Sequence, residues 1–325
     1  MTHSLLPLLA LGAIAALPLT AQRVTVAMLE ARTVPAADTM ITIRSGEKDL
    51  VAELRVPAGD GPHPVAIVIH GGCWVTRFAD SRYMKPLAEA LRNDGFATWT
   101  ISYRRADEPG GGWPGTFLDV ASMTAVLRHL APRYRLDLTR VIASGHSAGA
   151  HLALWLAAQP KLPAASGVNA VRDAVPIAAV VALDGPGDLV GANLGASRIC
   201  GGPILEQLLA STPAAEPERW KLASPTEWLP LRVPQAMVRG SFDLRLVAFG
   251  SEPGSMSVHA RRAQATGDSA WVVMGDSTSH FSLLDPEHPA YVVVRQAYRA
   301  ALAAIRPRNG AKSSAAEGTR VQRPR

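Results

Sequence analysis

The pentapeptide GHSAG, residues 145–149, places a serine between two glycines where one sequence pattern gives way to another. The run RVIAS before it is β-branched and apolar, as in a buried strand, and AGAHLALWLAA after it has the composition of a helix. A serine at such a strand-to-helix turn is exposed above the edge of the sheet, where the first amides of the helix favour negative charge. The pattern predicts that Ser147 is a nucleophile rather than a small residue that closes a turn.

A nucleophilic serine requires a general base, and His280 is the candidate among the nine histidines. It lies in VVMGDSTSHFSLLDP, just after the last expected strand, where a loop residue can reach the serine. His70 ends an earlier strand, HPVAIVIH, and is expected to brace its own loop instead.

A third group must orient the imidazole of the base and stabilise its cation. Where a serine occupies this kind of turn, the acid falls between the serine and the histidine along the chain. Asp243 ends the expected strand PQAMVRGSFD and is preferred for this role. Asp276, only four residues before the histidine, and Asp268, in an expected surface turn, are the alternatives.

The segment HGGCW, residues 70–74, follows a buried strand and supplies backbone amides that could hold an oxyanion. The expected donors are the amides of Gly72 and Cys73, together with that of Ala148 at the start of the helix after the serine. Trp74 and His146, which adjoin these two turns, are expected to contact the substrate.

The elements around these residues alternate between strand and helix, which predicts an α/β fold with a mainly parallel sheet and helices on both faces. An antiparallel hairpin, DTMITIRSG and DLVAELRVPA, begins a domain expected to span 38–305. Residues 186–229 break the alternation and are expected to form a small cap. In parallel sheets the carboxyl ends of the strands share one edge, so the expected site residues meet there.

The two ends of the chain are expected to lie outside this domain. Residues 1–21 have the layout of a signal peptide, with an apolar run and a small residue before a plausible cleavage point. The protein is therefore expected to be exported, periplasmic or secreted, without stable membrane insertion after cleavage. Residues 306–325 have no apolar periodicity and are expected to form a basic disordered tail.

Charge and cysteine content exclude several classes of protein. The formal net charge is +6, of which +5 lies in residues 306–325, so the rest offers no basic stripe and a nucleic-acid partner is not expected. The two cysteines, Cys73 and Cys200, rule out a disulfide-rich scaffold and give no metal-binding spacing. A bridge between them is chemically permitted after export and is left open, as is the oligomeric state. No cofactor or metal is expected.

Taken together, HGGCW, SYR, GHSAGAHLA, VRGSFD and HFSLLDP occur in an order that resembles bacterial α/β-hydrolases of the esterase/lipase type. Kynurenine formamidase-like enzymes and small acetyl- or feruloyl-esterases are the nearest resemblances, over roughly residues 40–305. The resemblance implies the α/β-hydrolase fold and a triad of Ser147, His280 and Asp243. Two departures set this chain apart: Arg239-Gly240 stands where His-Gly is usual, and the loop before the histidine is polar.

These observations predict a serine hydrolase that cleaves carboxylic esters of small molecules through an acyl-enzyme. Formamide or amide hydrolysis is the alternative, with an anionic aromatic substrate held by Arg104, Arg105 or Arg239. A peptidase is less favoured, because no gating domain is present. A binding module without activity is less favoured too, since no triad member is missing.

Overall fold

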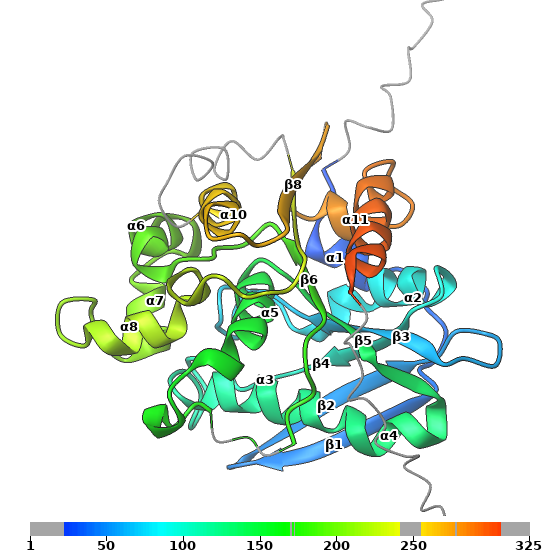
Figure 1. Ribbon diagram of the computed structural model, residues 1–325, viewed down its shortest axis with the longest axis horizontal. Helices are drawn as coiled ribbons and strands as arrows, with labels where there is room; N and C mark the ends of the chain where they lie inside the picture. Colours follow the sequence, from blue (N-terminus) through cyan, green and yellow to red (C-terminus); the bar gives the residue numbers. More distant parts are fainter. Residues whose placement is uncertain (1–22, 170, 172, 241–254, 277, 307–325) are drawn as a thin grey trace, which may run out of the picture.

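An eight-stranded sheet carries helices on both of its faces (Figure 1). The computed structural model describes residues 23–306, apart from 170, 172, 241–254 and 277. The strands are β1 (Thr39–Ser45), β2 (Lys48–Arg55), β3 (His63–Ile69), β4 (Ala97–Ile101), β5 (Leu136–His146), β6 (Ala179–Leu183), β7 (Gln235–Gly240) and β8 (Ala270–Gly275). Their order in the sheet is β1-β2-β4-β3-β5-β6-β7-β8. Strand β2 pairs antiparallel with both of its neighbours, β1 and β4, and all the other neighbouring strands pair in parallel. The predicted α/β fold with a mainly parallel sheet is confirmed.

Strand β3 is almost entirely apolar because both of its faces are covered. In β3, Val65 and Ile67 belong to one core cluster and Ala66 and Val68 to the other, and all four are fully buried. This alternation follows from the two-residue period of a strand, whose successive side chains point to opposite faces. The sheet therefore separates two hydrophobic cores.

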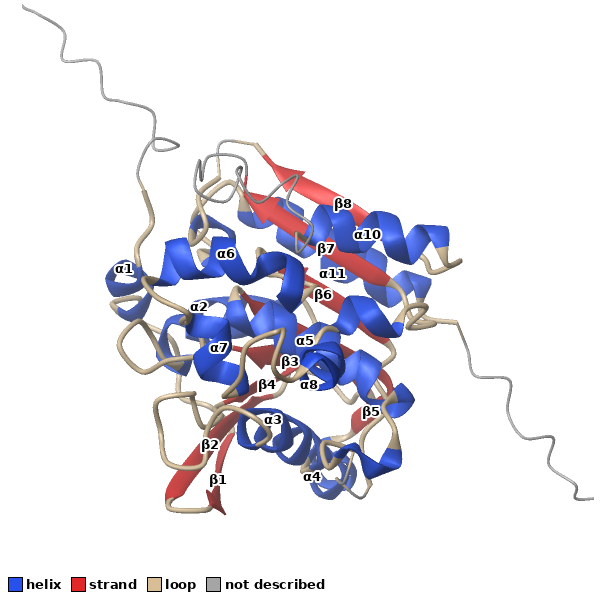
Figure 2. Cartoon of the chain, turned by 90° about the vertical axis from the view of Figure 1, so that its left-hand side faces the viewer, coloured by secondary structure: helices blue, strands red, loops and turns tan. Residues whose placement is uncertain are grey.

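The helices divide between these two cores, and Figure 2 shows them on both sides of the strands. The first core is covered by α3 (Gly115–Ala125), α4 (Leu127–Tyr134), α5 (Ala148–Ala158) and α10 (Met256–Ala265). The second is covered by α1 (Val26–Glu30), α2 (Lys85–Asn93) and α11 (Tyr291–Ala304). Single 3₁₀ turns lie at η2 (Ser81–Met84), η3 (Gln159–Lys161), η4 (Ala164–Ser166) and η6 (Ser282–Leu284).

The stretch expected to form a cap contains short helices that are tied to α5. They are α6 (Leu189–Cys200), α7 (Ile204–Leu209), α8 (Pro217–Ala223) and the 3₁₀ turn η5 (Pro225–Trp228). Nε2 of His151 donates to the carbonyl of Ala223 at 2.8 Å, and Nε1 of Trp155 donates to that of Leu222 at 3.1 Å. These bonds anchor α8 to the helix that carries the predicted nucleophile at its start.

The N-terminal part of the described chain packs against the second core. Val24 and Leu29 are buried there, and Arg32 forms an ion pair with Asp285 at 2.8 Å. The packed chain therefore extends N-terminal to residue 38, where the domain was expected to begin. The expected signal segment and the tail from 307 onward lie outside the described residues.

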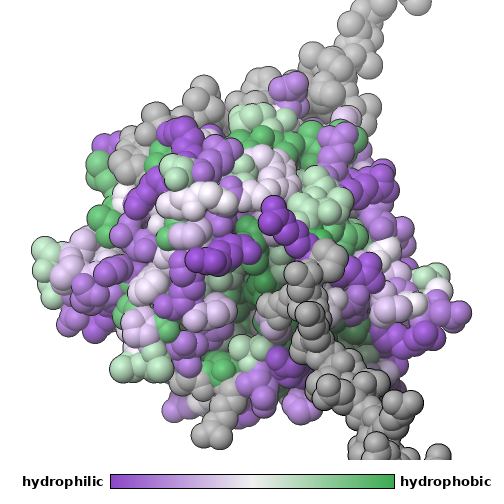
Figure 3. Space-filling view, in the orientation of Figure 1, coloured by the Kyte–Doolittle hydropathy of each residue, from purple (hydrophilic) through white to green (hydrophobic). Residues whose placement is uncertain are grey.

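The described surface mixes polar and apolar residues. The face in Figure 3 is a mosaic of hydrophilic and hydrophobic side chains, as is normal for globular proteins. Among the described helices, none combines the length and the apolar character needed to cross a membrane.

The strand order places a crevice beside the predicted nucleophile. From β3 the chain continues to β4 on one side, and later to β5 on the other. Ligands bind in α/β sheets at such a reversal, outside the carboxyl ends of the strands. The segment HGGCW follows β3 and Ser147 follows β5, so the topology brings the two predicted motifs together.

Four of the buried histidines are kept neutral at pH 7 by their surroundings. Burial lowers the pKa of His70 and of His151 to about 4, and that of His259 to about 3. Burial also holds the pKa of His146 well below its ordinary value.

We expect the free energy of unfolding to fall as the pH drops from about 6.5 towards 4. Below pH about 6.5 the unfolded chain binds a proton at each of these histidines while the folded chain does not, so protonation favours unfolding. Each histidine contributes up to about 1.4 kcal/mol per pH unit in this window. Urea unfolding at a series of pH values measures the slope. His259→Gln should reduce it and His129→Gln, at an exposed position, should not; a flat profile in the wild type would contradict the expectation.

Candidate active site

Ser147 occupies a strained turn between β5 and α5. Its backbone angles are φ 56° and ψ −118°, a region that residues other than glycine rarely adopt. A Cβ atom on Gly145 would come within 2.3 Å of the carbonyl oxygen of Gly149, and one on Gly149 within 2.1 Å of that of Ile69. Both flanking glycines are therefore required for the turn to pack against β3.

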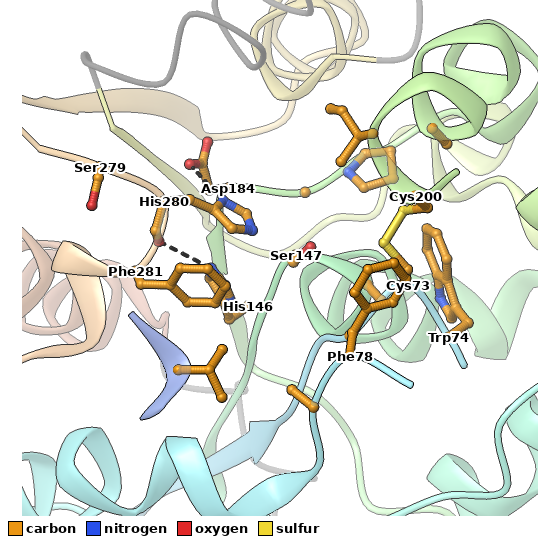
Figure 4. A pocket seen from close by; sticks show the side chains of 18 of the residues that line it. Cys73, Trp74, Phe78, His146, Ser147, Asp184, Cys200, Ser279, His280 and Phe281 are labelled. Atoms are coloured by element: carbon orange, nitrogen blue, oxygen red, sulfur yellow. Dashed lines mark hydrogen bonds and ion pairs between the residues drawn. A yellow bond between two sulfur atoms is a disulfide. The ribbon is translucent and has the colours of Figure 1, made fainter. Parts of the chain in front are cut away.

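The ring of His280 lies across from Ser147, and a carboxylate holds one of its nitrogens (Figure 4). Nδ1 of His280 is 3.0 Å from Oδ2 of Asp184, whose side chain is only 3% exposed. A carboxylate only accepts, so Nδ1 donates to it, and Nε2 is the nitrogen whose lone pair can accept a proton in the neutral tautomer. Figure 4 shows this second nitrogen on the side of the ring that faces Ser147. The arrangement suits a general base.

The turn after β3 has an unusual backbone. Gly72, Cys73 and Trp74 have φ values of 103°, 53° and 57°, three left-handed residues in succession. A Cβ atom on Gly71 would lie 2.9 Å from Cβ of Ser147, so this turn runs directly past the serine. Ala148 is the first residue of α5, and its amide has no carbonyl partner one turn earlier in the helix.

A chain of hydrogen bonds joins this turn to the loop that carries His280. The amide of Gly71 donates to Oη of Tyr83 at 2.6 Å, and Oη is 3.0 Å from Nδ1 of His146. Nε2 of His146 is 3.0 Å from the carbonyl oxygen of His280 and must donate to it. Nδ1 of the neutral ring then accepts the proton of Tyr83, in agreement with the lowered pKa of His146. Tyr83 and His146 therefore fix the two loops relative to each other.

The two cysteines form a disulfide. Cys73 and Cys200 have Cα atoms 5.9 Å apart, within the usual range for a bridge. The bond joins the turn after β3 to the last residue of α6, across 127 positions of sequence. The sequence analysis left this bridge open, and the structure contains it. It holds the last residue of α6 close to Ser147 (Figure 4).

Most of these groups line one cavity of about 380 Å³. That volume is near the lower end of the range of about 300–1,000 Å³ for small-molecule sites. Ser147, His280 and Asp184 reach the cavity, and so do Trp74 and His146, the residues expected to contact substrate. Apolar side chains make up most of its remaining wall, among them Val26, Phe78, Ala192, Ala196, Ile199, Met256 and Phe281.

The structure places only two of the three aspartates considered for the acid, and neither of these two contacts His280 among the described interactions. Asp243 lies outside the described residues, so its expected contact with His280 remains a prediction. Both carboxylate oxygens of Asp268 accept from the backbone amides of Leu231 and Arg232, at 2.6 and 2.8 Å, so this residue braces a turn. Asp276 is exposed at the end of β8.

Of the three arginines considered for binding an anionic substrate, one lines the cavity and two do not. Nε of Arg104 is 2.8 Å from Oδ2 of Asp119, and Nε of Arg105 is 3.2 Å from Oε2 of Glu108. These two arginines make structural ion pairs and do not line the cavity. Arg239 does line it and donates to a serine hydroxyl on α10.

Sequence reasoning missed Asp184 and Tyr83. The signal for Asp184 was present, because this residue directly follows the apolar strand AAVVAL, just as Asp243 follows the end of β7. Tyr83 gave no such signal, since it lies in a short 3₁₀ turn, η2, and is far along the chain from the loop that carries His280. Among the described side chains, no group of three His, Cys, Asp or Glu could hold a metal ion.

Comparison with known proteins assigns the family. The sequence profile of the BD-FAE family matches residues 53–249, more than half of the chain. The chain belongs to the BD-FAE family. This family is of the α/β-hydrolase esterase type, so the resemblance noted in the sequence is confirmed for this BD-FAE chain.

Solved structures agree on the fold of this BD-FAE chain. A truncated carbohydrate esterase from gut microbiota superposes with a TM-score of 0.63 at 19% identity, covering 82% of this chain and 98% of that one. Esterase 2 of Thermogutta terrifontis, in its apo form, gives a TM-score of 0.61 at 18% identity, covering 83% and 94%. At these identities the likeness shows the α/β-hydrolase fold.

Two curated fungal proteins share part of the sequence. The non-reducing polyketide synthases trt4 of Aspergillus terreus and adrD of Penicillium rubens are each 31% identical, over 134 and 128 residues. The matches cover 38% and 35% of this BD-FAE chain. The chain spans only 5% of the length of either synthase.

Tyr83→Phe should lower kcat about tenfold and leave KM nearly unchanged. Loss of the hydroxyl leaves the Gly71 amide and Nδ1 of His146 without their partner, at a cost of about 1–3 kcal/mol. Steady-state kinetics on an activated ester measures the effect.

Tyr298→Phe is the matched control, because this buried hydroxyl donates to Oγ of Ser144 beneath the sheet and touches neither loop. It should lose comparable thermal stability and keep its kcat. Equal kcat values for the two variants would show that Tyr83 supports only the fold.

Proposed function

We propose that this protein is a serine esterase that cleaves carboxylic esters of small molecules through a covalent acyl-enzyme. The observation that carries the proposal is the pairing of Ser147, on a strained turn, with a histidine whose other nitrogen is held by a buried carboxylate. A nucleophile and a base oriented by a third group form the general arrangement for acyl transfer. Membership of an esterase-type family supports the same reaction.

In the first half of the reaction, Nε2 of His280 takes the proton of Ser147 as Oγ attacks the ester carbonyl. The resulting tetrahedral oxyanion is held by backbone amides, for which Gly72, Cys73 and Ala148 are the proposed donors. His280 then passes the proton to the leaving alcohol oxygen as the bond from carbon to that oxygen breaks. The acyl group remains on Ser147.

In the second half, His280 removes a proton from water, and the hydroxide formed attacks the acyl-enzyme. Collapse of the second tetrahedral intermediate returns the proton to Oγ of Ser147 and releases the carboxylic acid. Each step uses side chains and amides of this chain alone. The buried carboxylate keeps the ring in the correct tautomer and stabilises the imidazolium that forms twice in each cycle.

We assign the third role to Asp184, on the strength of its 3.0 Å contact with His280. Asp243, the candidate from sequence, is the competing proposal. Hydrolysis of a formamide is the competing reaction; of the three arginines considered for an anionic substrate, Arg239 lies at the cavity wall. N-formyl-kynurenine tested beside p-nitrophenyl esters compares the two reactions, and we expect the esters to be preferred.

Ser147→Ala should abolish turnover and leave the fold intact. Loss of a nucleophile that works with a base lowers kcat by about 10⁶-fold in comparable enzymes. A fluorophosphonate probe should label the wild type and fail to label the variant, while circular dichroism of the two should coincide. Ester hydrolysis near the wild-type rate in Ser147→Ala would refute the proposed function.

Asp184→Asn should lower kcat by about 10⁴-fold, because an amide in place of the carboxylate favours the wrong tautomer of His280. Asp276→Asn, at the exposed end of β8, is the matched control and should have little effect. Asp243→Asn is expected to be mild. If it is the severe variant and Asp184→Asn the mild one, the acid is the residue predicted from the sequence.

A further inference from the structure

The cavity extends to two sides of Ser147, and the proposed proton transfer to the leaving alcohol indicates which part of the ester lies on each side. His280 must give its proton to the leaving alcohol oxygen, so the alcohol part of the ester lies on the side of the imidazole. The acyl part then extends away from the imidazole. Figure 4 shows His280, His146 and Phe281 on one side of Ser147, and Trp74, Phe78 and the disulfide on the other.

We propose that the acyl pocket is the part of the cavity enclosed by Trp74, Phe78, the Cys73–Cys200 disulfide and α6, and that it takes apolar acyl groups larger than acetyl. This inference rests on the proposed function and names the substrate class for the same site.

The wall of this pocket is apolar. Trp74 is 3% exposed and Phe78 is 43% exposed, so the first closes the inner part and the second stands at the mouth. The disulfide between them adds another nonpolar surface. A short acyl group such as acetyl would leave most of this surface uncovered, whereas a longer chain would remove it from water.

The facing helix contributes small residues at the spacing of one helix face. Ala192, Ala196 and Ile199 all line the cavity, three or four residues apart on α6. Alanine at the first two positions leaves room between the helix and Ser147. Ile199 is 36% exposed and limits the pocket where it opens to solvent. The depth available to an acyl chain is therefore set by α6.

The pocket is held in shape from two ends of α6. At the start of the helix, the side chain of Asp188 accepts from the amides of Val190 and Gly191. At its end, Cys200 is bonded to Cys73, and Nη2 of Arg77 donates to the carbonyl of Cys200 at 2.6 Å. A wall fixed in this way makes the acyl pocket pre-formed, which favours discrimination by chain length.

The test is the dependence of kcat/KM on acyl length, measured with p-nitrophenyl acetate, butyrate, hexanoate and octanoate. In the wild type, each added methylene should raise kcat/KM up to about fourfold until the pocket is full, from the transfer free energy of one buried CH₂. A profile that falls from acetate onward would overturn the proposal.

Ala196→Phe fills the pocket, and it should lower the ratio of kcat/KM for hexanoate to that for acetate at least tenfold. Leu194→Phe is the matched control, on the same helix at a side chain that is 64% exposed and does not line the cavity. It should leave the ratio unchanged. Ile199→Ala, which removes volume instead of adding it, should shift the preferred acyl group to a longer chain and covers the case in which Ala196→Phe does not fold.

A second series separates the two sides of the cavity. With the acyl group held as butyrate and the alcohol varied from ethyl to hexyl, Ala196→Phe should show the same alcohol dependence as the wild type. A changed alcohol profile with an unchanged acyl profile would place the alcohol against α6 and overturn the assignment. Failure of the wild type to react with the fluorophosphonate probe would instead refute the proposed function itself.

Discussion

The turns after β3 and β5 are in direct backbone contact, and the rest of the site depends on that contact. The carbonyl of Ile69 lies where a side chain on Gly149 would have to be, and the path of Gly71 leaves no room for a side chain beside Ser147. The glycines therefore serve the approach of two backbones. The approach sets the position of Ser147 relative to the amides that follow β3, which no flexible side chain could fix as closely.

A second constraint connects this pair of turns to the histidine. Tyr83 and His146 lie between them, fully buried, and each uses both of its hydrogen-bonding positions on backbone groups or on the other. Removal of one member of such a buried polar network costs much of its stabilising free energy, because the remaining groups are left without hydrogen-bond partners. The loop that carries His280 thus depends on two residues that have no role in the proposed bond changes.

Much of the fold could be predicted, because its signals are local. Apolar strands such as β3 and β5, and the glycine pattern around Ser147, depend on neighbouring residues. The disulfide, the contact of Tyr83 and the partner of His280 depend on distances between segments far apart in the chain, which sequence periodicity does not encode. The choice between Asp184 and Asp243 shows the difference. Both lie between Ser147 and His280 in the sequence, and Asp243 was preferred because it ends the expected strand PQAMVRGSFD. Only the folded chain shows that Asp184 contacts His280. The left-handed backbone at Cys73 and Trp74 was also beyond prediction, since such residues rarely adopt it.

The N-terminal segment ahead of β1 has a practical consequence for anyone who produces this enzyme. Arg23 and Val26 form part of the cavity wall, and Val24 and Leu29 are buried in the second core. A recombinant version trimmed to the first strand would lose these two residues of the cavity wall and expose the apolar surface beneath α1. Its substrate preference would then describe the trimmed protein and not the native one. An expression plasmid should therefore retain the residues from Arg23 to the start of β1.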